Sequence, residues 1–249
     1  MTATPDGVLI TGAGGGIGVA LCAAFSSAGY RVIATDSETR DCDCHGFVTL
    51  DLARLADDES VREVFRRETE TALAGLPLRV IVNNAAVQTL GGVGDLTLAS
   101  FRHSLDVNVS APLALVSMFL DSLSAQRGVV INIGSVHAQL TKPGFLAYAV
   151  SKAALAGLTR SLALDLAPRG IRVNEIRPGA TATPMLLAGF AADPAALAEV
   201  ADMQPLGRLA VPAEIAAMAV FLASSEAAFM TGAAIQVDGG IAARLHDPH

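Results

Sequence analysis

Residues 8–18 read Val-Leu-Ile-Thr-Gly-Ala-Gly-Gly-Gly-Ile-Gly, and this stretch decides the fold class. The apolar run 8–10 predicts a short buried strand, and helical spacing of apolar residues resumes over 19–28. Glycines between a strand and a helix allow a tight turn, and they let backbone N–H groups approach a pyrophosphate at the positive end of the helix. The stretch therefore predicts a nucleotide-binding turn, with a plain glycine-rich turn as the alternative.

A carboxylate follows at the distance that this kind of turn requires. Residues 30–34 predict a second strand, and Asp36, 18 residues beyond Gly18, stands at its carboxyl end. A carboxylate there accepts hydrogen bonds from both ribose hydroxyls and repels a 2′-phosphate, which favours NAD over NADP. Gly15 offers no basic side chain for such a phosphate, whereas Arg40 is close enough in sequence to keep NADP open.

The rest of the chain alternates strand and helix patterns. An amphipathic helix is predicted over 57–73 and a long buried helix over 101–123, interrupted near Pro112. Further strands are expected at 48–50, 79–82, 129–133, 171–176 and 234–237, further helices at 148–168 and 212–222, short helices within 186–203, and an irregular connection or a single helical turn over 37–46. This alternation predicts an α/β fold: a doubly wound parallel sheet with helices on both faces, in one domain over 1–249.

Composition narrows the functional class. With 249 residues, 52% of them hydrophobic, the chain can bury one sizeable core. A net charge of −7 without a Lys/Arg cluster argues against nucleic acid and anionic membrane as partners, and the apolar runs are too short and interrupted for a membrane span. Residues 1–7 lack the pattern of a secretory signal, and three cysteines fit a reducing compartment, so we expect a cytoplasmic protein acting on a small molecule.

Tyr148 and Lys152 form a candidate acid/base pair. They stand four apart on the predicted 148–168 helix, so their side chains share a face. A nearby ammonium favours the phenolate and lowers the pKa of the tyrosine, which suits a general acid/base near neutral pH. The alternative is an ordinary half-buried tyrosine beside a solvated lysine.

Several motifs occur in an order that resembles a known family. They are Thr11–Gly18, the Asn-Asn-Ala segment 83–85, Ser135, Tyr148 with Lys152, Pro178-Gly179 with Thr183-Pro184-Met185, and the closing segment from Thr231-Gly232 to Asp238-Gly239-Gly240. Over essentially its whole length the chain resembles a single-domain, NAD(H)-dependent short-chain dehydrogenase/reductase, which implies a single Rossmann-type domain. One departure is Ala86, which replaces the glycine usual after Asn-Asn-Ala.

The resemblance implies a catalytic tetrad. Tyr148 would be the acid/base, and Lys152 would lower its pKa and hold the nicotinamide ribose. Ser135 would hydrogen-bond the reacting oxygen. Asn108 would kink the long helix and anchor a water that reaches Lys152, with a purely structural amide as the alternative. In the oxidation direction Tyr148 would remove the hydroxyl proton while hydride passes to the cofactor.

The resemblance also implies the cofactor site and the assembly. Together with Tyr148 and Lys152, the expected cofactor-binding residues are Gly12, Gly16, Ile17, Gly18, Asp36, Asp51, Leu52, Asn83, Ala85, Pro178, Gly179, Thr181 and Thr183. Asp51 and Leu52 would close the adenine pocket, and Thr183 with the backbone near Thr181 would hold the carboxamide. The helices at 101–123 and 148–168 carry apolar residues beyond one core-facing stripe, which predicts a homo-oligomer. The family implies a homotetramer.

Substrate choice rests on two further positions. Gln88 and His137 are placed to join Ser135 and Tyr148 in lining the pocket above the nicotinamide. Related hydroxybutyrate and sugar dehydrogenases resemble the chain there, although Ala180 is smaller than the residue typical of the hydroxybutyrate enzymes. We expect a secondary alcohol or ketone, specifically a small polar hydroxy acid or sugar. The alternatives are an NADPH-dependent carbonyl reductase of the 3-oxoacyl type and a non-catalytic nucleotide-sensing relative.

Residues 41–45, Asp-Cys-Asp-Cys-His, invite a metal interpretation. Two thiolates and an imidazole in an irregular segment could bind one Zn²⁺. The sequence has no second cysteine pair, and Cys22 falls on a predicted helix, so a solvated loop beside the adenine ribose is the preferred interpretation and no metal is expected.

Overall fold

The computed structural model describes residues 6–245, and within them the strands form one parallel sheet in the order β3-β2-β1-β4-β5-β6-β7. Residues 1–5, most of the segment examined above for a secretory signal, lie outside the described residues. The strands are β1 (Gly7–Thr11), β2 (Arg31–Asp36), β3 (Gly46–Thr49), β4 (Leu78–Asn83), β5 (Val129–Ile133), β6 (Arg172–Pro178) and β7 (Ala234–Val237). Strands β1 and β5 are buried at every position, as expected of apolar strands covered on both faces.

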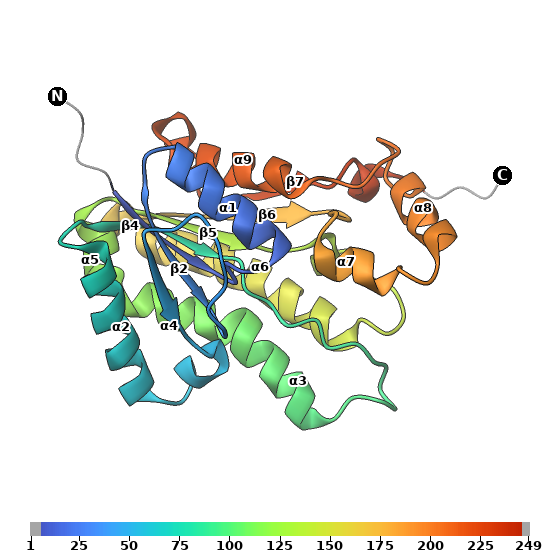
Figure 1. Cartoon of the computed structure of the whole chain (residues 1–249), viewed down its shortest axis with the longest axis horizontal. Coiled ribbons are helices and arrows are strands. Elements are labelled where there is room, and N and C mark those ends of the chain that lie inside the picture. Colours follow the sequence, from blue (N-terminus) through green and yellow to red (C-terminus); the bar gives the residue numbers. More distant parts are fainter. Residues whose placement is uncertain (1–5, 246–249) are drawn as a thin grey trace.

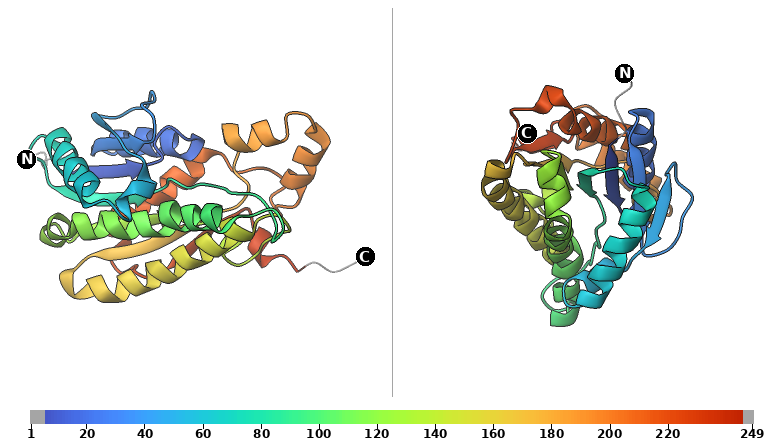
Figure 2. Two further views of the ribbon diagram at one scale, coloured as in Figure 1. Left: turned by 90° about the horizontal axis from the view of Figure 1, so that it is seen from below. Right: turned by 90° about the vertical axis from the view of Figure 1, so that its left-hand side faces the viewer.

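Helices cover both faces of the sheet, as the alternation predicts (Figures 1 and 2). One face packs against α1 (Gly16–Ser27) and α9 (Pro212–Ala223). The other packs against α2 (Glu59–Leu73), α4 (Ala111–Met118) and α6 (Leu146–Leu166). The segments α7 (Pro184–Gly189) and α8 (Pro194–Asp202) follow β6 and stand away from the sheet beyond one end of it (Figure 1).

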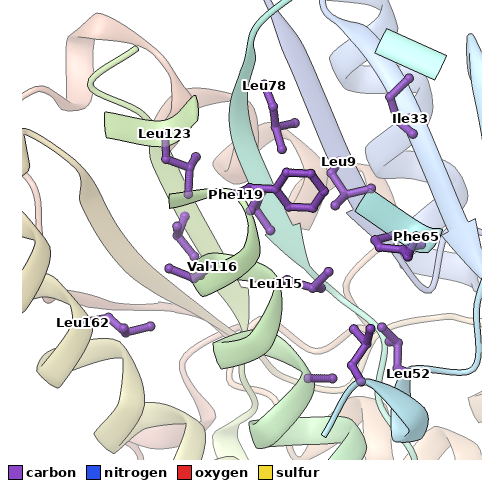
Figure 3. Packing of buried hydrophobic residues seen from close by; sticks show 14 of the residues in the cluster. Leu9, Ile33, Leu52, Phe65, Leu78, Leu115, Val116, Phe119, Leu123 and Leu162 are labelled. Atoms are coloured by element: carbon purple, nitrogen blue, oxygen red, sulfur yellow. The ribbon is translucent and has the colours of Figure 1, made fainter. Parts of the chain in front are cut away.

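The core on the α4 face is drawn in Figure 3. Leu9 and Leu78 come from the sheet, Phe65 from α2, and Leu115 from α4. The rings of Phe65 and Phe119 meet edge to face with their centroids 6.5 Å apart, and Phe119 is 3% exposed. This favourable aromatic geometry joins two helices over the central strands.

The predicted long helix is four consecutive segments. They are α3 (Leu98–Leu105), a π-helical turn (Asp106–Ser110), α4, and α5 (Leu120–Ala125). The helix is interrupted near Pro112, as predicted, by the π-helical turn that ends at Ser110, while Pro112 itself lies in the first turn of α4, where its missing N–H is tolerated. The helix departs from regular geometry at the π-turn around Asn108 and again at Phe119, whose φ is −107°. A π-turn of this kind often marks a functional site.

The other boundaries differ from the predictions by a few residues. Helix α6 begins at Leu146, two residues before Tyr148, and the segment between β2 and β3 has no helical turn. Single 3₁₀ turns lie at Leu52–Leu55, Val136–Ala138, Ala167–Arg169, Ser225–Ala227 and Ile241–Ala243. Between residues 6 and 245, no helix combines the length and apolar character that a membrane crossing requires. The carboxyl ends of the parallel strands meet at one edge, where such folds place their ligands.

Candidate active site

The glycine turn has no room for side chains at two positions. Gly12 has φ +62°, and a Cβ there would lie 2.7 Å from the Ala85 Cα. A Cβ on Gly18 would lie 2.0 Å from the Gly12 carbonyl oxygen. Gly15 precedes α1 without a side-chain cap, so the first N–H groups of the helix face the edge of the sheet unpaired by a side chain. The turn has the exposed donors and positive helix end that an anion such as a pyrophosphate requires.

Asn84, which the sequence reasoning missed, fixes the shape of this turn. Its Nδ2 donates to the carbonyl oxygens of Thr11 at 2.9 Å and Gly12 at 3.0 Å. The Thr11 hydroxyl in turn accepts from the backbone N–H groups of Asn84 and Ala85, each at 3.0 Å. The second asparagine of the Asn-Asn-Ala segment therefore joins β4 to the glycine turn.

The side chain of Asn83, an expected cofactor-binding residue, is buried and hydrogen-bonded within the protein. It is 3% exposed, and its Nδ2 donates to Asn132 Oδ1 at 2.8 Å. Asn132 donates to the hydroxyl of Thr159 on α6 at 2.8 Å. This row ties β4, β5 and α6 together beneath the site.

Asp36 lies against the glycine turn, as its position in sequence predicts. Its Oδ2 accepts from the Gly14 N–H at 3.0 Å and its Oδ1 from the Ser37 N–H at 2.8 Å. The Arg40 side chain lies over Gly14, where an added Cβ would be 2.0 Å from the Arg40 Cδ. Arg40 pairs with Glu38 at 3.4 Å, and both side chains are exposed. A carboxylate and a guanidinium therefore lie beside the same residue of the glycine turn.

The two residues predicted to close the adenine pocket have structural roles. The exposed Asp51 caps a 3₁₀ turn by accepting from the Ala53 N–H at 3.1 Å. The Leu52 side chain is buried in the core of the α4 face (Figure 3), and closure of the adenine pocket by Asp51 and Leu52 stays a prediction. Its apolar character serves the core, which the sequence alone could not distinguish from a ligand contact.

The segment after β6 meets the start of α1. Thr183 caps α7 by accepting from the Leu186 N–H at 3.2 Å, and a Cβ on Gly16 would lie 2.9 Å from the Thr183 Cβ. The predicted cofactor residues Pro178 and Thr181 precede it; both are buried. Gly179 lies so close to Asp238 that an added Cβ would be 2.9 Å from the Asp238 Cα. The glycine turn and the segment after β6, both assigned to the cofactor, thus lie side by side. The Ile17 side chain packs against the core on the α1 face of the sheet.

Asn108 binds the Val87 backbone and the Ser151 hydroxyl. From the π-turn its Nδ2 donates to the Val87 carbonyl at 3.0 Å and to the Ser151 hydroxyl at 2.9 Å, and its Oδ1 accepts from the Val87 N–H at 2.9 Å. Ser151 donates to the Tyr148 carbonyl at 2.8 Å. Asn108 therefore fixes the loop after β4, which carries the exposed Gln88, to the first turns of α6.

Tyr148 and Lys152 share a face of α6 as predicted, but their electrostatics differ from the prediction. The Lys152 Nζ lies 5.7 Å from the Tyr148 ring centroid and donates to the Ile133 carbonyl at 2.7 Å. Burial lowers the pKa of Lys152 to about 8, opposed by the charge of Glu175. Burial also raises the pKa of Tyr148, opposed by a hydrogen bond with Ser135. The predicted lowering of the tyrosine pKa is therefore wrong for this structure, because desolvation outweighs the hydrogen bond with Ser135.

Aromatic rings surround the Tyr148 phenol. His137 stacks on Phe145 with centroids 4.6 Å apart and an interplanar angle of 9°, and it meets Tyr148 edge to face at 5.8 Å. The Lys142 Nζ lies 4.6 Å from the Phe145 centroid. Burial lowers the pKa of His137, so its imidazole is neutral at neutral pH. The sequence reasoning missed Phe145 and Lys142. Phe145 could have been found, because it stands three residues before Tyr148 and residues at that spacing are neighbours on a helix. His137 and Gln88 make no hydrogen bond to each other within the described residues.

The cysteine segment does not assemble metal ligands. Within residues 6–245 no three His, Cys, Asp or Glu side chains are placed to hold one ion. His45 Nδ1 accepts from the Val32 N–H at 3.1 Å, which occupies the nitrogen. Burial raises the pKa of Cys22, and it raises that of Cys44 to about 11, so both remain thiols at neutral pH.

Sequence comparison shows what the chain is related to. A family model described as enoyl-(acyl carrier protein) reductase matches residues 12–242. Protein FixR of Bradyrhizobium diazoefficiens is 39% identical over 253 residues, covering 95% of this chain and 86% of FixR. Galactitol 2-dehydrogenase (L-tagatose-forming) of Cereibacter sphaeroides is 36% identical over 236 residues, covering 93% of this chain and 92% of that enzyme.

Solved structures of dehydrogenases have the same fold as this chain. The ligand-free aldohexose dehydrogenase of Thermoplasma acidophilum superposes with a TM-score of 0.88 at 28% identity, covering 98% of each chain. A candidate NAD(P)-dependent gluconate 5-dehydrogenase of Beutenbergia cavernae, with NADP at low occupancy, superposes with a TM-score of 0.84 at 32% identity, covering 97% of this chain and 98% of that one. By its ordered motifs, its site and these matches, the chain belongs to the short-chain dehydrogenase/reductase family.

Proposed function

We propose that this chain is an oxidoreductase that transfers a hydride between NAD(H) and a secondary alcohol or ketone. One observation carries the proposal. The Tyr148 phenol, which is hydrogen-bonded to Ser135, and the buried Lys152 share one face of α6 at the edge of the sheet where the glycine turn lies. Galactitol 2-dehydrogenase and aldohexose dehydrogenase, to which the chain is similar, are named for oxidation of CH–OH groups, which supports the same chemistry here.

The residues present fit a nicotinamide dinucleotide. Side chains are excluded at Gly12 and Gly18, the start of α1 has no side-chain cap, and the Asp36 carboxylate stands beside the turn. Backbone N–H groups of the turn would hold the pyrophosphate, and Asp36 a ribose. The cofactor supplies the hydride acceptor or donor. Of the remaining predicted contacts, Thr183 stands next to Gly16 and is therefore best placed to contribute.

The chain's own groups would carry the proton chemistry. In alcohol oxidation Tyr148, in its phenolate form, takes the hydroxyl proton and becomes the phenol, while Ser135 holds the reacting oxygen. The Lys152 ammonium stabilises the phenolate form, and Asn108 fixes the backbone on which these groups stand. In reduction the same tyrosine returns the proton to the oxygen.

The preference for NAD rests on Asp36. Its carboxylate lies at the carboxyl end of β2 and would repel a 2′-phosphate. Arg40 over Gly14 favours a second candidate, an NADPH-dependent carbonyl reductase, because a guanidinium in that corner can pair with a phosphate. Comparing kcat/KM with NAD⁺ and NADP⁺ separates the two. A higher value with NADP⁺ refutes the NAD assignment, and loss of that advantage in Arg40→Ala would identify its source.

A small polyol or sugar is the proposed substrate class. Phe145 and His137 present a stacked aromatic face beside the Tyr148 phenol, suited to the C–H face of a sugar, and Gln88 offers an amide at the rim. The exposed Lys142 leaves a hydroxy acid as the other member of the class. The test is reduction of NAD⁺ and of NADP⁺ over alditols, aldoses, hydroxy acids, cyclic alcohols and steroids. Turnover confined to steroids would overturn the proposed substrate class.

We also propose a homotetramer located in the cytoplasm. Apolar side chains are exposed on α4 and α6, including Leu113, Val150 and Leu164, the last 80% exposed. Phe221 on α9 and the fully exposed Phe229, which follows a 3₁₀ turn, are further exposed apolar residues. Exposed apolar side chains on different helices are what a tetramer with two kinds of contact would use. Light scattering of the purified protein tests the assembly, and a monomeric mass would refute it. The three cysteines, all free thiols, fit a reducing compartment.

A further inference from the structure

Beneath the proposed active site lies a buried ion pair that none of the roles above uses. Glu175 and Arg177 stand on β6, 1% and 4% exposed, and Arg177 Nη2 donates to Glu175 Oε2 at 3.0 Å. Two charges in the sheet interior carry a large desolvation penalty, which one mutual hydrogen bond does not offset. A well-packed hydrophobic pair at these two positions would avoid that penalty, so the charges of Glu175 and Arg177 need a functional explanation.

The other carboxylate oxygen lies against the strand that holds the lysine. Glu175 Oε1 is buried without a hydrogen-bond partner in the described residues, and an added Cβ on Gly134 would lie 2.0 Å from it. Gly134 follows Ile133, whose carbonyl oxygen accepts from Lys152 Nζ. The unpaired acceptor therefore lies beside the peptide to which the ammonium is bound.

We propose that Glu175 is a positioning residue for the hydride-transfer reaction: its carboxylate keeps Lys152 charged and seated beside Tyr148, and Arg177 keeps that carboxylate charged. This rests on the proposed function for its catalytic meaning. The geometry places the carboxylate against Gly134, the residue that follows the carbonyl to which the Lys152 ammonium donates, and within the described residues that carbonyl is the hydrogen-bond acceptor of the ammonium. An ammonium with so few partners needs a counter-charge to stay protonated in the interior.

The charges around Lys152 support this assignment. Within the described residues, the titratable groups near Lys152 are Tyr148 on its own helix and Glu175 on β6. Glu175 is paired with Arg177, and His137, after β5, contacts Tyr148. Of these, the charge of Glu175 raises the pKa of Lys152 against the burial that lowers it to about 8. Without Glu175, the lysine would lose its proton closer to neutral pH.

The first test needs neither cofactor nor substrate. Glu175→Gln and Lys152→Met are combined in a double-mutant cycle, and unfolding by urea is followed by circular dichroism at several pH values from about 7 to about 10. At neutral pH the two changes should be coupled, because Glu175 attracts a charged Lys152. The coupling should fade as pH rises through the lysine pKa, because a neutral amine does not need the carboxylate. A coupling that is absent, or constant with pH, would refute the proposal.

A second variant guards against misfolding of Glu175→Gln, which leaves Arg177 buried without its counter-ion. Glu175→Gln with Arg177→Met removes both charges and keeps side-chain volume, and this double variant replaces Glu175→Gln as one arm of the cycle with Lys152→Met. The pH-dependent coupling should persist, because it belongs to the carboxylate and the lysine. If it disappears in this second cycle, the effect came from the stranded guanidinium and the assignment to Glu175 is wrong.

The functional consequence is a shift of the pH profile. If the wild-type protein oxidises an alcohol with NAD⁺, the alkaline limb of kcat/KM should move to lower pH by about one unit in Glu175→Gln, as removal of a neighbouring opposite charge does. A residue that only supports the fold would lower activity equally at all pH values, and that result would refute the positioning role. Absence of dehydrogenase activity in the wild type would refute the proposed function instead, while the unfolding cycle still decides whether Glu175 and Lys152 are coupled.

Discussion

Replacing Lys152 by Met should stabilise the folded protein at neutral pH while removing the proposed catalytic charge. The pKa of Lys152 falls from its ordinary 10.5 to about 8 because the side chain is 2% exposed. At about 1.4 kcal/mol for each pH unit, the difference destabilises the folded state by about 3 kcal/mol at pH 7. The bond to the Ile133 carbonyl, lost in the variant, offsets about 1–2 kcal/mol of this. We therefore expect Lys152→Met to be about 1–2 kcal/mol more stable at pH 7.

The sign of the pH dependence follows from the depressed pKa. Between about pH 8 and 10.5 the unfolded chain binds a proton that the folded chain has lost, so wild-type stability gains from this group as pH rises. The advantage of Lys152→Met should therefore shrink over this range and reverse above it. Other groups that titrate there are common to both proteins and cancel in the difference.

The assay is urea unfolding followed by far-ultraviolet circular dichroism, because the sequence has no tryptophan to report by fluorescence. The chain offers a matched control, since Lys142 is its other lysine and is exposed. Lys142→Met should change stability little at any pH. If Lys152→Met were less stable than wild type by the same amount at pH 7 and pH 10, the ammonium would be well paired, and the argument from burial would fail.

Three further changes test the site and the core. Tyr148→Phe should lower kcat about 10²–10⁴-fold and leave cofactor affinity, measured by titration calorimetry, largely intact; near-normal turnover would contradict the acid/base role. Gly18→Ala places a methyl 2.0 Å from the Gly12 carbonyl and should weaken cofactor binding at least tenfold, whereas Gly15→Ala, whose nearest atom is 3.4 Å away, is the matched control; equal binding by both would refute the cradle. Phe119→Ala should lower the free energy of unfolding by about 3–5 kcal/mol in the same urea assay, and a loss below about 1 kcal/mol would mean that the Phe65 contact contributes little.

The sheet and its helices could be predicted from local signals because the central strands carry apolar runs between polar ends. The run 129–133 is one case, buried at every position between two neighbouring strands. The π-turn at Asp106–Ser110 could not be predicted in the same way. Proline at 112 was the visible signal, but the wide turn lies around Asn108, whose hydrogen bonds reach Val87 and Ser151, far away in the sequence.

The site residues divide along the same line. Positions fixed by backbone shape, such as Gly12 and Gly18, were predictable because the strand, turn and helix that need them are adjacent in sequence. Partners across the sheet were not predictable. Asn83, the last residue of β4, binds Asn132, whereas Asn84, which follows the strand, binds the glycine turn, and nothing local in the sequence separates the two. That the whole chain forms one domain stays a prediction, as do the roles of the tetrad.

The electrostatic state of the Tyr148 pair shows why residue types alone were insufficient. The sequence places a phenol and an ammonium on one face and predicts that each favours the charge of the other. In the structure burial works against both charges, raising the pKa of Tyr148 and lowering that of Lys152. An acid/base pair can operate under these conditions only if something besides the pair favours its charged forms. Glu175 is the charged group in the described structure that does so for the lysine, and it lies on a strand 23 residues further along the chain, where no spacing rule would look for it.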